Sequence, residues 1–162
     1  MLNQEKVNQL FYYNPQTGIF IHRTNCPRSK FKKGDTAGRI RNDGYLLISI
    51  EGENYYGHRL AFLYMTSRWP EHQVDHINGI RHDNTWSNLR KATQSQNQQN
   101  QKKAHKDNFS GLLGAYVSKN GYITSEITCK GKSFNLGSFK SIESAHQAYI
   151  NAKRKIHEFN TL

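Results

Sequence analysis

Short apolar runs alternate with turn-forming residues up to about residue 57, a pattern typical of small antiparallel sheets. Asn, Pro and Gly cluster at 14–18 and predict a turn, and the apolar residues 19–21 predict a strand directly after it. Further strands are predicted at 37–41, 45–50 and 54–56, with hairpin turns at 42–44 and 51–53. This region therefore predicts a small antiparallel sheet.

A different order of elements is predicted from residue 58 to about residue 100. Residues 58–66 place Leu60, Ala61, Leu63 and Tyr64 at helical spacing, and Pro70 ends that pattern. The elements predicted next are a short strand at 74–76, a polar loop at 78–87, a second short strand at 88–93 and a helix beginning at Gln94. The order strand, loop, strand, helix is thus expected within a short segment.

The remaining chain predicts a sheet followed by a helix. A polar, basic connector at 96–108 is typical of a solvated linker or of a helix lying on DNA. Strands are predicted at 114–119, 122–128 and 133–139, with turns at Asn120-Gly121 and Lys130-Gly131. A final helix begins after Ser141, the predicted N-cap, and its apolar stripe is Ile142, Ala145, Tyr149, Ala152 and Ile156.

These patterns predict an α+β protein. Its parts are a small antiparallel N-terminal sheet, a strand–loop–strand–helix core, and a three-stranded antiparallel sheet packed on one C-terminal helix. The expected boundaries are a first domain at 1–100 with its core at about 72–100, a basic linker at 101–108 and a second domain at 109–162.

Charge indicates the class of partner. The 162 residues include 23 Lys and Arg against 12 Asp and Glu, a formal net charge of +11. Such an excess favours a polyanion, because basic side chains neutralise phosphates and release counterions. A nucleic acid is therefore the expected partner.

Composition argues against a membrane protein, a secreted protein and a thiolate-bound zinc site. No apolar run approaches the ~20 residues that span a bilayer, and the first residues lack a signal-peptide pattern, so we expect a cytoplasmic protein that is not secreted. Cys26 and Cys129 are far apart and predict incidental free thiols. Any bound metal would need oxygen and imidazole ligands, which favours Mg²⁺ or Mn²⁺ over thiolate-bound zinc.

The segment 74–97 has the residues that phosphodiester hydrolysis requires. Asp75 and His76 are adjacent at a strand end, and Asn97 lies on the following predicted helix. Because adjacent strand residues point to opposite faces, both serve one site only where the strand bends or ends. Oxygen ligands such as Asp75 and Asn97 can hold a cation, and a neutral imidazole such as His76 can take a proton from water.

This segment resembles the HNH endonucleases of phages and mobile introns, which have a ββα-metal site. The three residues of the name match His76, Asn88 and Asn97, with the spacing of the phage homing-type branch. The flanking sequence also matches over roughly residues 10–100, in Gly57-His58-Arg59-Leu60-Ala61-Phe62, Pro70, Val74-Asp75-His76-Ile77-Asn78-Gly79, Asp83-Asn84, Asn88-Leu89-Arg90 and Ala92-Thr93.

The resemblance implies a role for each matched residue. His76 would be the general base, and Asp75 and Asn97 would ligate one divalent cation, Mg²⁺ or Mn²⁺. Asn88 would hydrogen-bond within the loop and so orient His76. Many members have His where Asn97 stands. A neutral amide is a weaker ligand than a carboxylate, so modest metal affinity is expected, helped by the substrate phosphate.

Neighbouring residues have simpler expected roles. His58 either supports the site or packs, with packing support favoured. Asp83 and Asn84 are expected to form the loop through local side-chain to backbone bonds and are not first choices as ligands. Trp86 is expected to anchor the core or the loop.

Residues 109–159 resemble the DNA-binding domain named after the plant APETALA2 factors. The match lies in Phe109-Ser110-Gly111, Gly114, Tyr122, Gly131-Lys132, Leu136-Gly137-Ser138-Phe139, Ser144-Ala145, Ala148-Tyr149 and Ala152. The resemblance implies a three-stranded sheet on one helix, with the exposed sheet face in the major groove. Leu113 stands where the family has Arg, and Val117 stands near the position of a Trp that is common in the family. These two differences remove expected base and phosphate contacts.

The resulting hypothesis is a monomeric, metal-dependent endonuclease of double-stranded DNA, homing-type and phage-encoded, acting in the host cytoplasm without an obligatory protein partner. One site in a monomer would nick one strand, and a double-strand break would need a second site or event. The alternative is a non-catalytic DNA-binding regulator that uses the APETALA2-like domain. The residues predicted to contact DNA are Arg39, Arg41, Arg90, Lys91, Lys102, Lys103, Lys119, Lys130 and Lys132.

Overall fold

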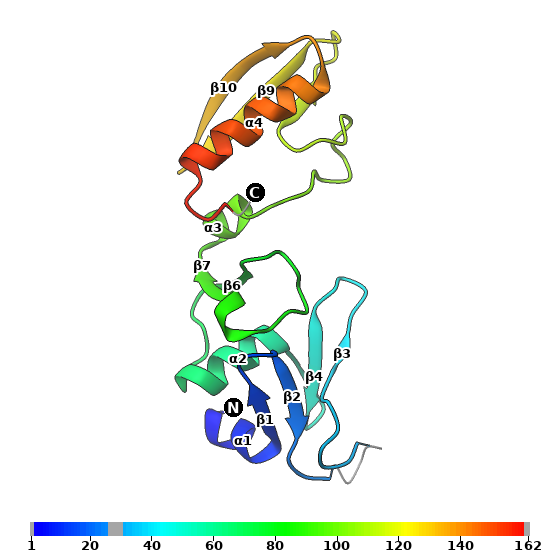
Figure 1. Ribbon diagram of the computed structural model, residues 1–162, viewed down its shortest axis with the longest axis vertical. Helices are drawn as coiled ribbons and strands as arrows, with labels where there is room; N and C mark the ends of the chain where they lie inside the picture. Colours follow the sequence, from blue (N-terminus) through cyan, green and yellow to red (C-terminus); the bar gives the residue numbers. More distant parts are fainter. Residues whose placement is uncertain (1, 26–30, 161–162) are drawn as a thin grey trace. The chain divides into compact units, whose positions relative to one another are not determined.

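The computed structural model describes residues 2–25 and 31–160 and divides into two units, Met1–Thr93 and Gln94–Leu162 (Figure 1). Its elements are short helices and small antiparallel sheets, so the predicted α+β class is confirmed. Cys26 lies outside the described residues.

The first unit begins with a helix and a hairpin. Helix α1 (Gln4–Leu10) is capped by Asn3, whose Oδ1 accepts a hydrogen bond from the Lys6 backbone N–H at 2.9 Å. Strands β1 (Phe11–Asn14) and β2 (Ile19–His22) then form an antiparallel hairpin. Neither α1 nor β1 was predicted. The cap at Asn3 and the acidic Glu5 in the first turn are the signals that mark this helix.

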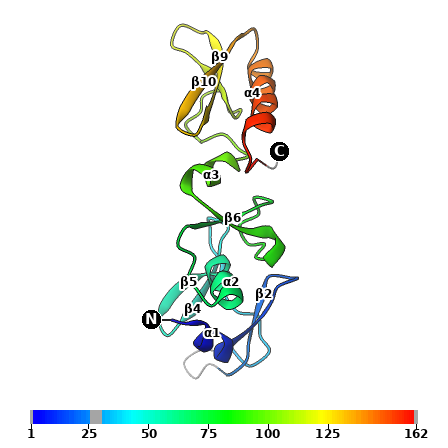
Figure 2. The same cartoon turned by 90° about the vertical axis from the view of Figure 1, so that its left-hand side faces the viewer.

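A three-stranded antiparallel sheet and a helix follow. The strands are β3 (Arg39–Ile40), β4 (Leu46–Ile50) and β5 (Glu53–Tyr56), in the order β3-β4-β5. Helix α2 (Gly57–Thr66) starts directly after β5 and packs against α1, as Figure 2 shows. Strand β3 is shorter than the predicted strand at 37–41, because Gly38 has a left-handed φ of 94°.

The last part of the first unit is a two-stranded antiparallel sheet. Strand β6 (Gln73–His76) pairs with β7 (Leu89–Ala92), and His76 lies opposite Leu89. The loop between them ends in a 3-10 helix, η1 (Trp86–Asn88), so Asn88 precedes the strand in which it was predicted. The core of the unit joins all these elements and includes Val7, Phe20, Ile48, Leu60, Val74 and Leu89.

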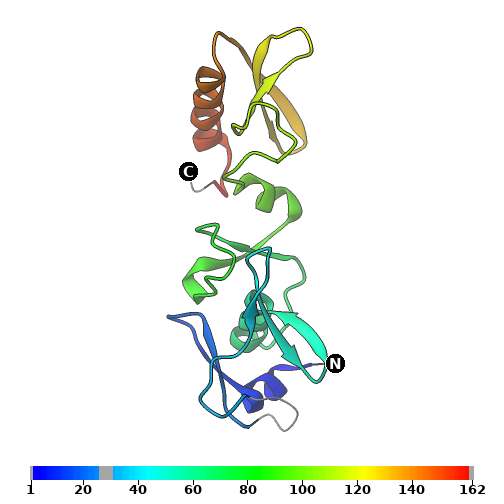
Figure 3. The same cartoon turned by 90° about the vertical axis from the view of Figure 1, so that its right-hand side faces the viewer.

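The second unit begins with α3 (Gln94–Gln99) and continues into a sheet and a helix. Strands β8 (Ala115–Val117), β9 (Ile123–Cys129) and β10 (Lys132–Phe139) are antiparallel in the order β10-β9-β8. Helix α4 (Ile142–Ile156) lies along one side of this sheet and contacts all three strands, as Figures 2 and 3 show. Ser141 caps α4, as predicted.

One sequence prediction for this unit needs correction. The end of the apolar stripe on α4 was wrong: Ile156 is 39% exposed, whereas Lys153, which was not assigned to the stripe, is 0% exposed. The segment 96–108, expected as a solvated linker or a helix lying on DNA, begins within α3 and includes the buried Asn100. Cys129 is a free thiol. In the part of the chain described, no helix combines the length and apolarity needed to cross a membrane.

Candidate active site

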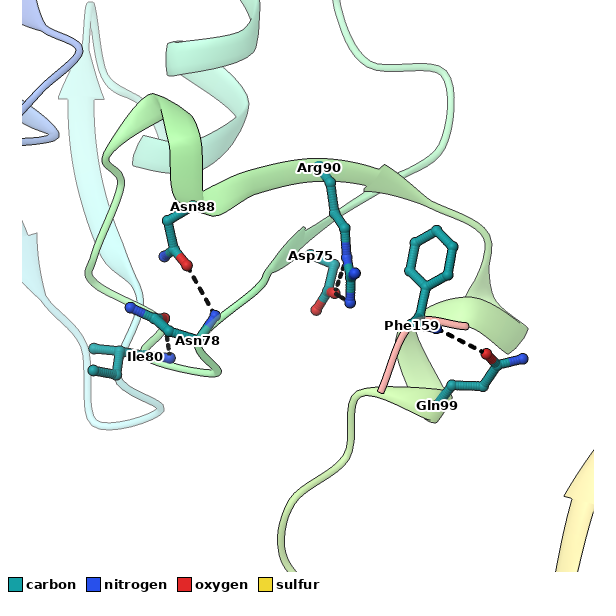
Figure 4. A network of polar contacts seen from close by, with 7 residues as sticks. All are labelled: Asp75, Asn78, Ile80, Asn88, Arg90, Gln99 and Phe159. Atoms are coloured by element: carbon teal, nitrogen blue, oxygen red, sulfur yellow. Dashed lines mark hydrogen bonds and ion pairs between the residues drawn. The ribbon is translucent and has the colours of Figure 1, made fainter. Parts of the chain in front are cut away.

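The loop between β6 and β7 is held by its own polar side chains. Asn88 accepts a hydrogen bond from the Asn78 backbone N–H at 2.9 Å, drawn in Figure 4, and donates from Nδ2 to the Asp83 carbonyl at 2.8 Å. Asp83 in turn accepts from the Thr85 backbone and hydroxyl. These bonds lower the pKa of Asp83, against its desolvation, so the carboxylate stays ionised. Asn88 therefore hydrogen-bonds within the loop, and its role in orienting His76 stays a prediction.

Asp75 is buried, with 5% of its surface exposed, and its carboxylate is paired with Arg90 on the neighbouring strand. Arg90 donates to the same oxygen, Oδ2, from Nε at 2.9 Å and from Nη2 at 2.8 Å (Figure 4). Arg90 was predicted to contact DNA, and the structure gives it this carboxylate as a partner. A buried carboxylate needs such compensation, because an unpaired buried charge is costly.

His76 is about as buried as Asp75, with 4% of its surface exposed, and its hydrogen-bond partner comes from the loop. Its Nε2 is 3.2 Å from Oδ1 of Asn84. The Asn84 amide nitrogen donates to the His82 carbonyl, which leaves the amide oxygen as the acceptor for His76. This network assigns the proton of His76 to Nε2 and the lone pair to Nδ1.

Burial keeps His76 neutral. Desolvation lowers its pKa, while the Asn84 hydrogen bond and the charges of Asp75 and Asp83 act in the opposite direction. The net shift is downward, so the imidazole is uncharged near pH 7. A neutral imidazole is the form that a general base requires.

Asn84 is the site residue whose importance sequence reasoning missed. It was assigned to the loop, yet it is 1% exposed and orients His76 directly. The Tyr13 hydroxyl of β1 donates to the Asn84 carbonyl at 2.6 Å. Gly18 in the same hairpin approaches so closely that a Cβ there would lie 2.4 Å from the Asn84 carbonyl carbon. The N-terminal hairpin therefore holds Asn84 in place, and Asn84 in turn orients His76.

His58, at the start of α2, packs on the other side of the site. Its ring meets that of His76 edge-on, with centroids 5.1 Å apart and an interplanar angle of 80°. Its Nδ1 is buried, and no described residue offers it a hydrogen bond. Burial, with the nearby His76 and Arg59, lowers the pKa of His58 to about 3. His58 is thus a neutral ring that supports His76, the packing role expected for it.

Aromatic rings extend the site toward the three-stranded sheet. Tyr56 stacks on His58 with centroids 5.4 Å apart, and Arg41 donates to the Tyr56 hydroxyl at 3.0 Å. Arg41 belongs to an open groove lined by Arg39, Ile40, Arg41, Asn42, Leu47 and Asn54. Arg41, which was predicted to contact DNA, is thus connected through the Tyr56 ring to the buried histidines.

The other predicted residues are placed as follows. Asn97 lies half-buried on α3 in the second unit, and its role as a metal ligand stays a prediction. Trp86 packs against Phe62 with centroids 4.8 Å apart, and its backbone N–H donates to the Pro15 carbonyl, so it is the anchor expected. The predicted DNA contacts that are exposed are Arg39, Arg41, Lys91, Lys103, Lys119, Lys130 and Lys132, and Lys102 is half-buried.

The donor chemistry near Asp75 fits a hard divalent cation. A buried carboxylate oxygen is a ligand that Mg²⁺ and Mn²⁺ prefer. Within residues 2–25 and 31–160, no three His, Cys, Asp or Glu side chains gather in a group that could hold a metal ion. A cation at Asp75 would therefore take further oxygen ligands from amides, water or a substrate phosphate.

Comparison with known proteins gives one family match. Residues 55–99, from β5 through α3, match the family model described as HNH endonuclease. Comparison with curated proteins and with solved structures gives no match. The matched segment contains Asp75, His76, Asn84 and Asn88 in the geometry described above. Residues 55–99 are therefore similar to HNH endonucleases, and this match supports a DNA-cleaving hydrolase.

Proposed function

We propose that the chain is a metal-dependent endonuclease of double-stranded DNA, in which His76 takes the proton from the attacking water. The observation that carries this proposal is the state of His76. It is buried and neutral, and Asn84 holds its Nε2 so that Nδ1 has the lone pair. Hydrolysis of a phosphodiester needs such a base next to a cation.

Asp75 is the proposed metal ligand of the first unit, with Asn97 as the second ligand that the sequence predicts. When bound, Mg²⁺ or Mn²⁺ would stabilise the charge that develops on the phosphate and the leaving oxygen. Arg90 compensates the Asp75 carboxylate by bonding to Oδ2. Asn88 keeps the loop closed, which fixes Asn84 and hence the direction of the His76 ring.

The groove beside Arg39 and Arg41 is the proposed path of the DNA backbone in the first unit. Exposed arginines bind phosphates without reading sequence, and the contact of Arg41 with Tyr56 fixes the side chain in place. In the second unit, Lys119, Lys130 and Lys132 are exposed at or beside the strand turns and would add backbone contacts. The APETALA2-like function of that unit, the homing type and a phage origin belong to this proposal through sequence resemblance.

The test is cleavage of supercoiled plasmid by the purified full chain. We expect nicked or linear product with Mg²⁺ or Mn²⁺, and none with EDTA. Asp75→Asn should abolish the product, whereas Asp107→Asn, at an exposed position of the connector, should leave it unchanged. The ratio of nicked to linear product tells single-strand from double-strand cutting.

Absence of cleavage by the wild type with every divalent cation tried would contradict the proposal. Retained binding of DNA in that case would identify the chain as a non-catalytic DNA-binding protein.

A further inference from the structure

Lys153 is the most unusual residue of the second unit. It lies on α4 between Tyr149 and His157 at helical spacing, and it is 0% exposed. Lysine is almost never fully buried unless its ammonium group has a partner. The position falls on the buried face of the helix, where the sequence pattern predicted only apolar residues.

The partner of Lys153 is a backbone carbonyl and not a carboxylate. Its Nζ donates a hydrogen bond to the carbonyl oxygen of Gln101, two residues after the end of α3. Its Nζ also lies 5.7 Å from the centroid of the Tyr149 ring. Burial, together with the charge of Lys102, lowers the pKa of Lys153 to about 8. The bond therefore holds the segment that directly follows α3.

Further contacts hold the same segment. The backbone N–H of Phe159 donates to Oε1 of Gln99, the last residue of α3, at 3.4 Å (Figure 4). Asn100 is 6% exposed. His157 anchors the end of α4 to the sheet, because its Nε2 is 2.9 Å from the Thr128 carbonyl oxygen of β9. The end of α3 is thus bonded to the end of α4, and α4 is bonded to its own sheet.

We propose that Lys153 is a positioning residue that fixes α3, and with it Asn97, to the C-terminal unit. The inference rests on the proposed function, in which Asn97 is a metal ligand. Its consequence is that the C-terminal unit contributes to the cleavage step as well as to DNA affinity. Lys153 does so through the Gln101 carbonyl.

The test compares Lys153→Met with Lys155→Met in the full chain. Methionine keeps most of the length of lysine but has no donor for the Gln101 carbonyl, and Lys155 is an exposed residue of the same helix. Limited trypsin digestion reads out the connector directly at Lys102, Lys103 and Lys106. We expect Lys153→Met to be cut there about 10-fold faster than the wild type, because losing the bond favours local opening.

Activity is the second readout. We expect Lys153→Met to lower kcat for plasmid nicking by about 10-fold while KM for DNA changes by less than about twofold, because the group lost acts on the reacting geometry and not on DNA binding. Lys153→Gln, which keeps an N–H donor, should restore part of kcat. Lys155→Met should match the wild type in both measurements.

Each outcome decides a separate point. Unchanged digestion of Lys153→Met overturns the bond to α3, and faster digestion with unchanged kcat overturns the positioning role. Full activity of Asn97→Ala would show that the proposed function is wrong about that ligand, whatever the digestion shows. If Lys153→Met does not fold, amide hydrogen exchange of residues 97–103 in the wild type decides. Protection similar to that of α4 supports the proposal, and exchange at the rate of an unfolded chain overturns it.

Discussion

Polar side chains are buried in both units, but their arrangement differs. In residues 1–93, the buried polar groups His58, Asp75, His76, Asn84 and Asn88 gather around a single loop and the strands beside it. In residues 94–162, the buried polar groups include Ser125, Lys153 and His157, and each donates or accepts one bond that ties two backbone segments together.

We interpret this difference as that between a proposed reactive site and a structural arrangement. Around the loop of the first unit, His76 bonds to the Asn84 side chain and Asp75 bonds to the Arg90 side chain. A buried ring nitrogen without a partner among the described residues occurs in both units, at Nδ1 of His58 and at Nδ1 of His157, and so does not distinguish them. In the second unit, the partners are backbone carbonyls of Gly114, Gln101 and Thr128. That arrangement stabilises a fold.

The largest expected effect comes from closing the space beside Asn84. Gly18→Ala combines a φ of +71° with a Cβ only 2.4 Å from Asn84 backbone, so we expect a loss of about 3 kcal/mol in the free energy of unfolding. Gly121→Ala is the matched control, because Gly121 has φ +80° with nothing within 4 Å, and it should cost about 1 kcal/mol. Urea denaturation measures both. Equal losses would show that the hairpin does not support the loop.

Asn84→Ala should have the next largest effect, on catalysis. Without the amide oxygen, Nε2 of His76 loses its acceptor, and we expect kcat to fall by about 10- to 100-fold with little change in KM. Asn151→Ala, at an exposed position of α4, is the control. A kcat within about twofold of the wild type would contradict the orienting role, since loss of such a partner changes activity by about 10-fold or more.

The sequence indicated the proposed site residues better than it indicated the residues that hold them in place. Asp75, His76 and Asn88 were predicted because they are close together in a recognisable order. Asn84 was in the same loop, but its role depends on Tyr13 and Gly18, which are far away in the sequence and have no local signal for this contact. Lys153 was missed for a related reason, since a helical stripe is defined by apolar residues and a buried lysine breaks the pattern.

His58 predicts a pH dependence of stability for the first unit. Its pKa falls from 6.5 to about 3 on folding, so between these values the unfolded chain binds a proton that the folded chain does not. Stability is therefore fully present above pH 6.5 and is lost as the pH falls. We expect a loss of about 2 kcal/mol between pH 7 and pH 5 from this residue. Urea denaturation at pH 7 and pH 5 measures this loss in the wild type and in His58→Phe. The free energy of unfolding of His58→Phe should fall by about 2 kcal/mol less than that of the wild type. An equal fall in the two proteins would contradict this account.

The smallest expected effect concerns the basic residues of the second unit. Lys132→Ala should weaken DNA binding by less than about tenfold at low salt and reduce the slope of log K against log salt by about 0.9, the value for one lost phosphate contact. Fluorescence anisotropy at several salt concentrations measures the slope. An unchanged slope would place Lys132 outside the DNA interface.

The most direct test of the central claim is single-turnover cleavage of supercoiled DNA by His76→Ala at saturating Mn²⁺, with DNA binding measured in parallel. Loss of a general base should slow cleavage by about 1,000-fold while DNA binding stays unchanged. Cleavage by His76→Ala at the wild-type rate would contradict the account, because no role for the buried, neutral ring would then remain in the reaction.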